Sequence, residues 1–182
     1  SSAWIVSVHS KKGYISPDRT WNIEPQYDKI IPLNDNLIGV GKIKEPETYH
    51  VSHWTPDMVY GIIDKSEKII CNIEYEFISR FSNKRALIQK NNKYGYINDR
   101  GQIIIPLKYD KAVEFCNGTA IVGVNTHEWD DKDTFKYTII DIMGNELCPC
   151  RFDHIKPTNV NSVFRIFEDN RVGLIDNHGH II

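Results

Sequence analysis

Residues 93–115 read KYGYINDRGQIIIPLKYDKAVEF, and they contain the pattern on which the rest of the chain is built. Counted from Gly95, an isoleucine follows at +2, a glycine at +6 and a tyrosine–aspartate pair begins at +14. Most of these residue types recur from four other starting points, the last in a shortened copy: Gly13, Gly61, Thr138 (in the glycine position) and Gly173. Self-similarity at fixed offsets indicates a repeat architecture.

Each repeat predicts four short strands. The glycine segment is the first strand, and turns such as NDRG and SPDR close it. An isoleucine-rich run followed by proline is the second, and proline marks a bend because it donates no ladder hydrogen bond. The aromatic–acid pair lies in the third, and the fourth strands are expected at 37–41, 86–90, 120–124 and 163–167. No segment has sustained helical periodicity, so the chain is predicted to be all-β.

The tandem four-stranded antiparallel units are expected to form one domain over residues 1–182. The N-terminal stretch from Ala3 to Val8 resembles a fourth strand, and the chain ends with a first and a second strand. Pairing the ends would close a small five-unit β-propeller without open strand edges. An open β-solenoid capped by partial repeats is the alternative. The units cover about 11–41, 59–90, 93–124, 136–167, and a composite of 171–182 with 3–9.

The recurring pattern resembles the WG-repeat (KWG-repeat) family of bacterial proteins. The best copies are Tyr94-Gly95-Tyr96-Ile97-Asn98 and Tyr60-Gly61-Ile62-Ile63-Asp64, each followed by an apolar strand and a tyrosine–acid pair. The tryptophan of the family name is replaced in every unit. The resemblance covers most of the chain and implies a repeat scaffold for interactions, with no catalytic residues to transfer.

Two insertions, residues 42–58 and 125–135, interrupt the repeat spacing. Both are expected to join a fourth strand to the next first strand and to emerge on one face, and added loops often carry function. They contain aromatic, histidine and acidic residues predicted to contact a partner: Tyr49, His50, His53, Trp54, His127, Glu128, Trp129, Asp130, Asp131 and Asp133.

Large aromatics in polar loops are typical of interface anchors. The carboxylates around Trp129 form an acidic surface suited to a basic groove, such as that of a nuclease. In the structural alternative, both tryptophans fold back over the sheet. A metal site built from His50, His53, His127 and Glu128 is geometrically conceivable, but we expect no metal and no cofactor.

Other chemically notable residues are assigned structural roles. The aromatic–acid pairs recur once per unit, so we expect a buried ring and a carboxylate that accepts turn or backbone hydrogen bonds. Cys71 and Cys148 share the +10 position with isoleucines, which predicts core thiols. Cys148-Pro149-Cys150 has neither redox nor zinc-site spacing.

Composition excludes several classes of protein. The 22 basic residues nearly balance the 24 acidic ones, giving a net charge of −2, so nucleic-acid binding is not expected. No apolar run approaches the roughly 20 residues of a membrane span. The N-terminus shows no signal-peptide pattern, so a cytoplasmic location is expected.

No catalytic motif is found, which predicts a protein that is not an enzyme. The favoured hypothesis is a protein-binding scaffold, monomeric when free, that acts as an immunity or inhibitor protein against a bacterial toxin. The alternatives are a repeat interaction module of the envelope or cell surface, and a carbohydrate-binding module that stacks sugars on Trp54 and Trp129.

Overall fold

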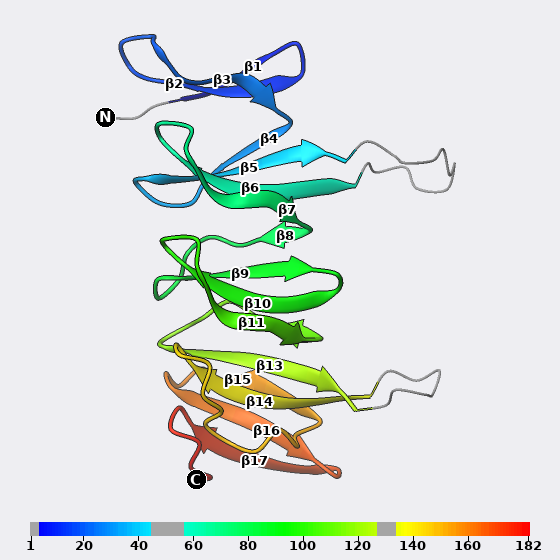
Figure 1. The fold of residues 1–182 in the computed structure, drawn as a ribbon. Helices are drawn as coiled ribbons and strands as arrows, with labels where there is room; N and C mark the ends of the chain where they lie inside the picture. The colour runs from blue at the N-terminus through cyan, green and yellow to red at the C-terminus, as the bar shows by residue number, and fades with distance from the viewer. Residues whose placement is uncertain (1–3, 45–56, 127–133) are drawn as a thin grey trace. The chain divides into compact units, whose positions relative to one another are not determined.

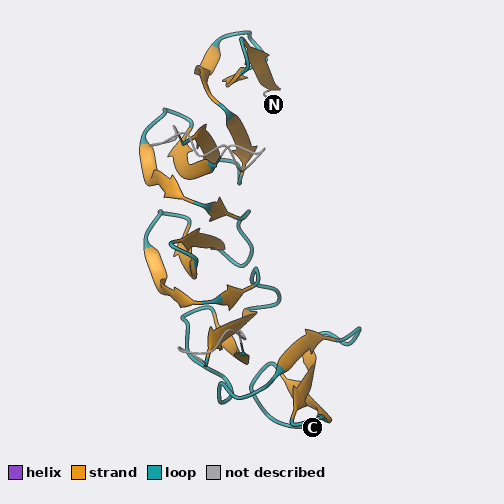
Figure 2. Cartoon of the chain, turned by 90° about the vertical axis from the view of Figure 1, so that its right-hand side faces the viewer, coloured by secondary structure: helices purple, strands orange, loops and turns teal. Residues whose placement is uncertain are grey.

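The computed structural model describes residues 4–44, 57–126 and 134–182, in which every regular element is a β-strand (Figures 1 and 2). The strands form five antiparallel sheets of three or four strands each. The chain divides into two compact units, Ser1–Arg80 with Asp99–Gln102, and Phe81–Asn98 with Ile103–Ile182. The prediction of an all-β protein is therefore confirmed.

The five sheets follow one another along the sequence, as the labels in Figure 1 show. Their strand orders are β1-β2-β3, β4-β5-β6-β7, β11-β10-β9-β8, β12-β13-β14 and β15-β16-β17. The strands are β1 (Trp4–Val8), β2 (Lys11–Ile15), β3 (Trp21–Tyr27), β4 (Lys29–Pro32), β5 (Leu37–Ile43), β6 (Met58–Asp64), β7 (Ile69–Tyr75), β8 (Phe77–Ile78), β9 (Arg85–Lys90), β10 (Lys93–Asn98), β11 (Ile103–Tyr109), β12 (Lys111–Ala112), β13 (Thr119–Asn125), β14 (Phe135–Asp141), β15 (His154–Pro157), β16 (Val163–Glu168) and β17 (Arg171–Asp176).

Sheets combine strands of consecutive repeats. In the second sheet, β4 and β5 are the third and fourth strands of one repeat, and β6 and β7 are the first and second strands of the next. β1 takes the fourth-strand place beside β2, as its sequence predicted. In every sheet an aliphatic residue of the fourth strand pairs with the glycine position: Val6 with Gly13, Val40 with Gly61, Ile88 with Gly95, Val122 with Thr138 and Ile166 with Gly173. The repeat spacing therefore corresponds to one common strand register.

The closed five-unit propeller expected from the sequence is not found among the described strands, which form separate sheets. β1 pairs with β2, and β17 pairs with β16. After β17, Ile181 forms a single bridge back to Ile175. The strands at both ends of the described chain thus find partners in adjacent hairpins, and the all-β repeat forms without the predicted ring closure.

The turn after each first strand is built in the same way. The residue at +6 has a positive φ, between 62° and 87°, in all five repeats: Arg19, Glu67, Gly101, Gly144 and Gly179. A positive φ favours glycine, which explains the three glycines among them. At +3, the Asp141 carboxylate accepts hydrogen bonds from the backbone amides of Met143 and Asn145, at 2.8 and 2.9 Å. The turn signals in the sequence thus have a conformational cause.

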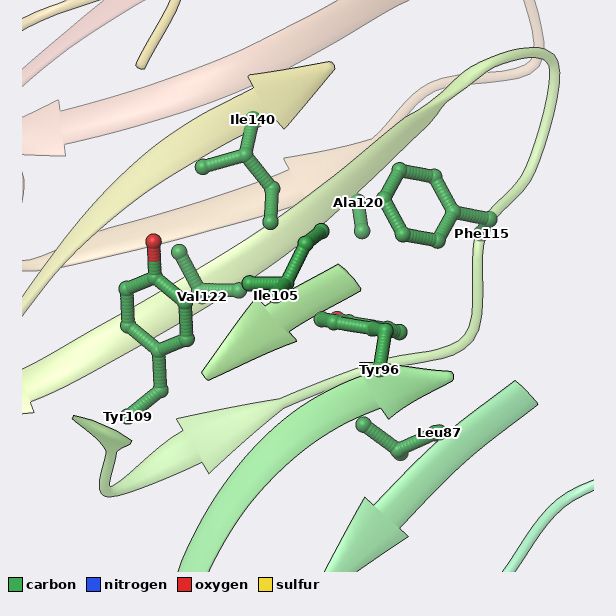
Figure 3. Close-up of a cluster of buried hydrophobic side chains, with 8 residues drawn as sticks. All are labelled: Leu87, Tyr96, Ile105, Tyr109, Phe115, Ala120, Val122 and Ile140. Atoms are coloured by element: carbon green, nitrogen blue, oxygen red, sulfur yellow. The ribbon is translucent and has the colours of Figure 1, made fainter. Parts of the chain in front are cut away.

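Buried side chains of consecutive sheets form the core. Tyr96 and Phe115 pack edge to face with ring centroids 4.7 Å apart, and the Tyr96 hydroxyl donates to the Val113 carbonyl at 2.7 Å. Figure 3 shows this cluster, whose members are Leu87, Tyr96, Ile105, Tyr109, Phe115, Ala120, Val122 and Ile140. A second cluster in the same unit contains Ile139, Cys148, Phe152, Ile155, Ile166 and Ile175. The first unit has its own cluster of Ile23, Tyr27, Ile30, Ile38, Val40 and Ile63.

Candidate functional site

Two hairpins carry the insertions selected from the sequence. The β5–β6 hairpin is closed at its base by a hydrogen bond from the Lys44 amide to the Asp57 carbonyl, at 2.8 Å. The β13–β14 hairpin is closed by the amide of Thr126 and the carbonyl of Thr134, at 2.9 Å. Both insertions thus join a fourth strand to the next first strand. The ten candidate contact residues all lie outside the described residues: Tyr49, His50, His53, Trp54, His127, Glu128, Trp129, Asp130, Asp131 and Asp133.

In three of the four aromatic–acid pairs, the aspartate binds a lysine side chain and a backbone amide. We call this arrangement the polar clamp. In the first repeat, Lys11 Nζ lies 2.6 Å from Asp28 Oδ1, and Asp28 Oδ2 accepts a hydrogen bond from the Ile43 amide at 2.9 Å. The carboxylate therefore connects the first strand with the end of the fourth. The same clamp is formed by Lys93, Asp110 and the Asn125 amide, and by Lys136, Asp153 and the Asp169 amide.

The clamp fixes the charged form of its carboxylates. Hydrogen bonds from Lys11 and from the Ile43 amide lower the pKa of Asp28 below its ordinary value. Lys136 and the Asp169 amide do the same for the pKa of Asp153. In the second repeat the lysine and the aspartate are absent together, since Val59 and Glu76 occupy these positions. The acids of the clamps thus have a structural role.

The aromatic members of these pairs are buried in all four repeats, at Tyr27, Tyr75, Tyr109 and Phe152. The rings of Tyr27, Tyr109 and Phe152 belong to the core clusters, while the neighbouring aspartates make the clamps. The predicted division of labour, with a buried ring and a hydrogen-bonded carboxylate, is confirmed. These residues therefore belong to the scaffold and leave the functional site to be found elsewhere.

The glycine position is crossed closely by the second strand. A Cβ on Gly95 would lie 2.6 Å from the Ile105 carbonyl oxygen, nearer than side-chain carbons approach in folded proteins. In the fourth repeat the position holds Thr138, whose Oγ1 donates to the Cys148 carbonyl at 2.6 Å. The second-strand segment of this repeat has only two isolated bridges, at Glu146 and at Phe152, instead of a continuous strand. The side chain of Thr138 explains this loss, because it occupies the space that strand crossing requires.

All four cysteines are free thiols. Cys71 and Cys148 are buried, as predicted, and burial raises the pKa of Cys71. Burial also raises the pKa of Cys150, whereas Cys116 is exposed. Within residues 4–44, 57–126 and 134–182, no group of three or more histidine, cysteine, aspartate or glutamate residues has an arrangement suited to a metal ion.

A pocket of about 610 Å³ lies in the second unit and is lined by residues of both the fourth and the fifth sheet. Sequence reasoning missed it, although a signal was available at +20 of each repeat. That position is apolar in three repeats, at Leu33, Phe81 and Phe115, and polar in the fourth, at Thr158. Thr158 lines the pocket. The replacement of an apolar residue by threonine at this repeated position was therefore the sequence signal for the cavity.

The described part of the chain offers no helix with the length and apolar character of a membrane span. Its repeated hairpins, clamps and glycine crossings define an all-β repeat protein. Residues 13–42, 60–94 and 94–125, more than half of the chain, match the WG containing repeat, and the chain belongs to this family. Neither the curated proteins nor the solved structures contain a match. The matched residues end before the fourth repeat, where Thr138 replaces the glycine.

Proposed function

We propose that this chain is a non-enzymatic protein-binding scaffold that contacts its partner through the loops of the β5–β6 and β13–β14 hairpins. The supporting observation is that both insertions extend strand pairs of seven residues with closed bases. Loops on a well-packed scaffold place binding residues without changing the repeat itself. A repeat protein-interaction module is also what membership of the WG-repeat family suggests.

The partner that best fits the second loop is a basic protein, and within this class we propose a bacterial toxin such as a nuclease. Residues 127–133 contain four acidic side chains around Trp129. Acidic groups favour encounter with a basic active-site groove, while a tryptophan supplies a buried anchor. In this proposal the chain neutralises the toxin by covering that groove.

The test is a triple variant, Trp129→Ala with Asp130→Ala and Asp131→Ala, in the full chain. The partner is first recovered from the native host with the unaltered chain, and its affinity for both proteins is then measured by calorimetry. Loss of a central anchor and two charges is expected to weaken binding by about a hundredfold or more. Protection of cells that express the partner should be lost in parallel.

A matched control removes one exposed tryptophan and two exposed aspartates from the described surface: Trp4→Ala, Asp35→Ala and Asp99→Ala. This variant should bind as the unaltered chain does. Equal affinity of the loop variant and the control, with both proteins folded, rejects the loop as the binding site. A partner without toxic activity rejects the inhibitor proposal and leaves the scaffold proposal standing.

A further inference from the structure

The pocket in the second unit lies where the fourth repeat has a threonine at a position that is aromatic in the preceding repeat. Tyr96 and Phe115, at +1 and +20 of the third repeat, are both almost fully buried (Figure 3). The corresponding residues of the fourth repeat are Ile139, which is buried in the core, and Thr158, which lines the pocket. Thr158 uses its hydroxyl to close its own turn, donating to the Val163 carbonyl at 2.9 Å. No ring fills the position that Phe115 fills one repeat earlier.

Both walls of the pocket end in short edge strands. β12 is the outer strand of the fourth sheet and β15 is the outer strand of the fifth. β12 has two residues, and β15 contains Lys156 and Pro157, features that discourage addition of another strand. The pocket is therefore better suited to a compact ligand than to an extended peptide.

The surface that lines the pocket is mostly apolar and includes aromatic side chains. Val113, Ile121, Val160 and Phe164 contribute to it, and Val113 and Val160 are at least half exposed to solvent. A volume of about 610 Å³ lies within the range of small-molecule sites, which are mostly apolar with a few polar groups. The ligand should accordingly have an apolar body.

Basic groups outnumber acidic groups at the pocket. Lys111, His154 and Lys156 are among the lining residues, against a single acid, Glu114. All four are exposed, so they stand where a charged group of a bound ligand remains in contact with water. This charge balance favours an anion, although the whole chain carries a net charge of −2.

A row of aromatic rings continues from the pocket. The centroid of Tyr137 lies 6.5 Å from that of Phe135 and 6.1 Å from that of His154, and His154 lies 6.3 Å from Phe167. The Lys111 ammonium is 4.7 Å from the Phe135 centroid. Partly exposed rings beside cations are suited to a flat ligand with delocalised electrons.

We propose that this pocket binds a flat, apolar organic anion, whose ring system occupies the space beside Thr158 and whose acidic group faces Lys111 and His154. None of the lining residues belongs to the two insertions, and the proposal does not depend on the proposed protein partner. Lys111 is expected to contribute most to anion binding, because it lines the pocket and its ammonium lies over the Phe135 ring.

The probe is 8-anilinonaphthalene-1-sulfonate, a fluorescent aromatic sulfonate, compared with N-phenyl-1-naphthylamine, which has the same ring system without the charge. We expect one sulfonate site per chain, and binding about two- to fivefold tighter than that of the neutral amine. Absence of saturable sulfonate binding, or equal affinity for both probes, overturns the proposal of an anion site.

Two substitutions locate the site. Thr158→Phe restores the aromatic residue of the preceding repeat and should weaken sulfonate binding about tenfold or more. Its control is Thr126→Phe, because Thr126 also donates its hydroxyl to a backbone carbonyl but does not line the pocket.

Lys111→Gln should weaken binding of the sulfonate but not of the neutral amine. Its control is Lys108→Gln, since Lys108 also lies over an aromatic ring, 5.0 Å from the Tyr109 centroid.

Cys116 provides a measurement that needs no variant, because this exposed thiol lines the pocket. Saturating sulfonate should slow alkylation of Cys116 severalfold, as followed by peptide mapping in the mass spectrometer. A misfolded Thr158→Phe chain would increase the fluorescence of the dye, which is the opposite of the expected change. Unaltered binding by folded Thr158→Phe, or unaltered alkylation of Cys116, contradicts the proposed location.

Discussion

The hydroxyl of Thr138 donates a buried hydrogen bond to the carbonyl oxygen of Cys148, with a separation of 2.6 Å. In the first three repeats the corresponding carbonyl passes directly over a glycine. The fourth repeat thus replaces close backbone contact with a side-chain hydrogen bond, and its stability depends on a group that its neighbours lack.

Thr138→Val should destabilise the protein by about 1–3 kcal/mol, because a buried carbonyl loses its donor while the side-chain volume is kept. The free energy of unfolding is measured by urea denaturation. Thr126→Val removes a hydroxyl whose hydrogen bond is exposed, and its effect should stay within about 0.5 kcal/mol. Equal effects of the two substitutions would contradict the role given to Thr138.

Gly95→Ala should cost about 1–3 kcal/mol, since the new methyl group would meet the backbone of Ile105 and of Leu107, at 2.6 and 2.9 Å. Gly173 provides the comparison within the same chain. There a Cβ meets only the Ile166 side chain, at 3.4 Å, so Gly173→Ala should change stability by less than about 0.5 kcal/mol. Thermal unfolding of both variants checks the difference, and a similar loss at both positions would refute it.

Tyr109 is predicted to contribute through its ring and not through its hydroxyl. The hydroxyl oxygen is buried without a hydrogen-bond partner in the described structure, and Phe152 occupies the same position in the next repeat. Tyr109→Phe should therefore leave the melting temperature unchanged or raise it. Tyr109→Ala should cost about 3–5 kcal/mol, the loss typical of a large aromatic core residue. A large destabilisation by Tyr109→Phe would show that the hydroxyl is needed.

The Lys11–Asp28 clamp should make stability depend on pH. The pKa of Asp28 is lower in the folded chain than the value of about 3.9 expected when unfolded, so the unfolded chain binds the proton first as the pH falls. The contribution is fully present above the unfolded pKa and disappears as the pH falls through the folded pKa.

Urea midpoints of the unaltered chain and of Asp28→Asn should therefore differ more near neutral pH than at a pH below the folded pKa of Asp28, where both chains carry a neutral group at position 28. Asp35→Asn, in an exposed turn, is the control and should show a smaller difference. If the difference between Asp28→Asn and the unaltered chain is the same at both pH values, the clamp does not hold the carboxylate in its charged form.

Much of the fold could be predicted because the repeat offsets indicate the strands and their register. The prediction that the aromatic–acid pair lies in the third strand was wrong, because the tyrosine ends the second strand, as in β3 and β11. The offsets from Gly95 predicted the four fourth strands and the fourth-strand role of β1, and the structure confirms these. Ring closure could not be predicted in the same way. The sequence of β1 is compatible with pairing at either end, and the adjacent hairpin of β2 provides a partner at short separation in the chain.

The candidate sites were less accessible to sequence reasoning. The insertions were recognised by their length, and their contact residues, such as Trp54 and Trp129, remain predictions. The pocket required a comparison of one position across repeats, because Thr158 looks like an ordinary turn residue until it is aligned with Phe115. Its walls come from strands whose spacing depends on packing, which residue types alone do not specify.

The polar clamp also has a consequence for how such a chain can change over evolutionary time. Each clamp joins a lysine and an aspartate of one repeat to an amide at or just after the end of that repeat's fourth strand, as in Lys11, Asp28 and Ile43, whereas the sheets combine strands of neighbouring repeats. Duplication or deletion of a whole repeat by recombination therefore leaves no clamp with a missing charge. The array can be lengthened or shortened in whole repeats, while a break inside a repeat separates a lysine from its acid.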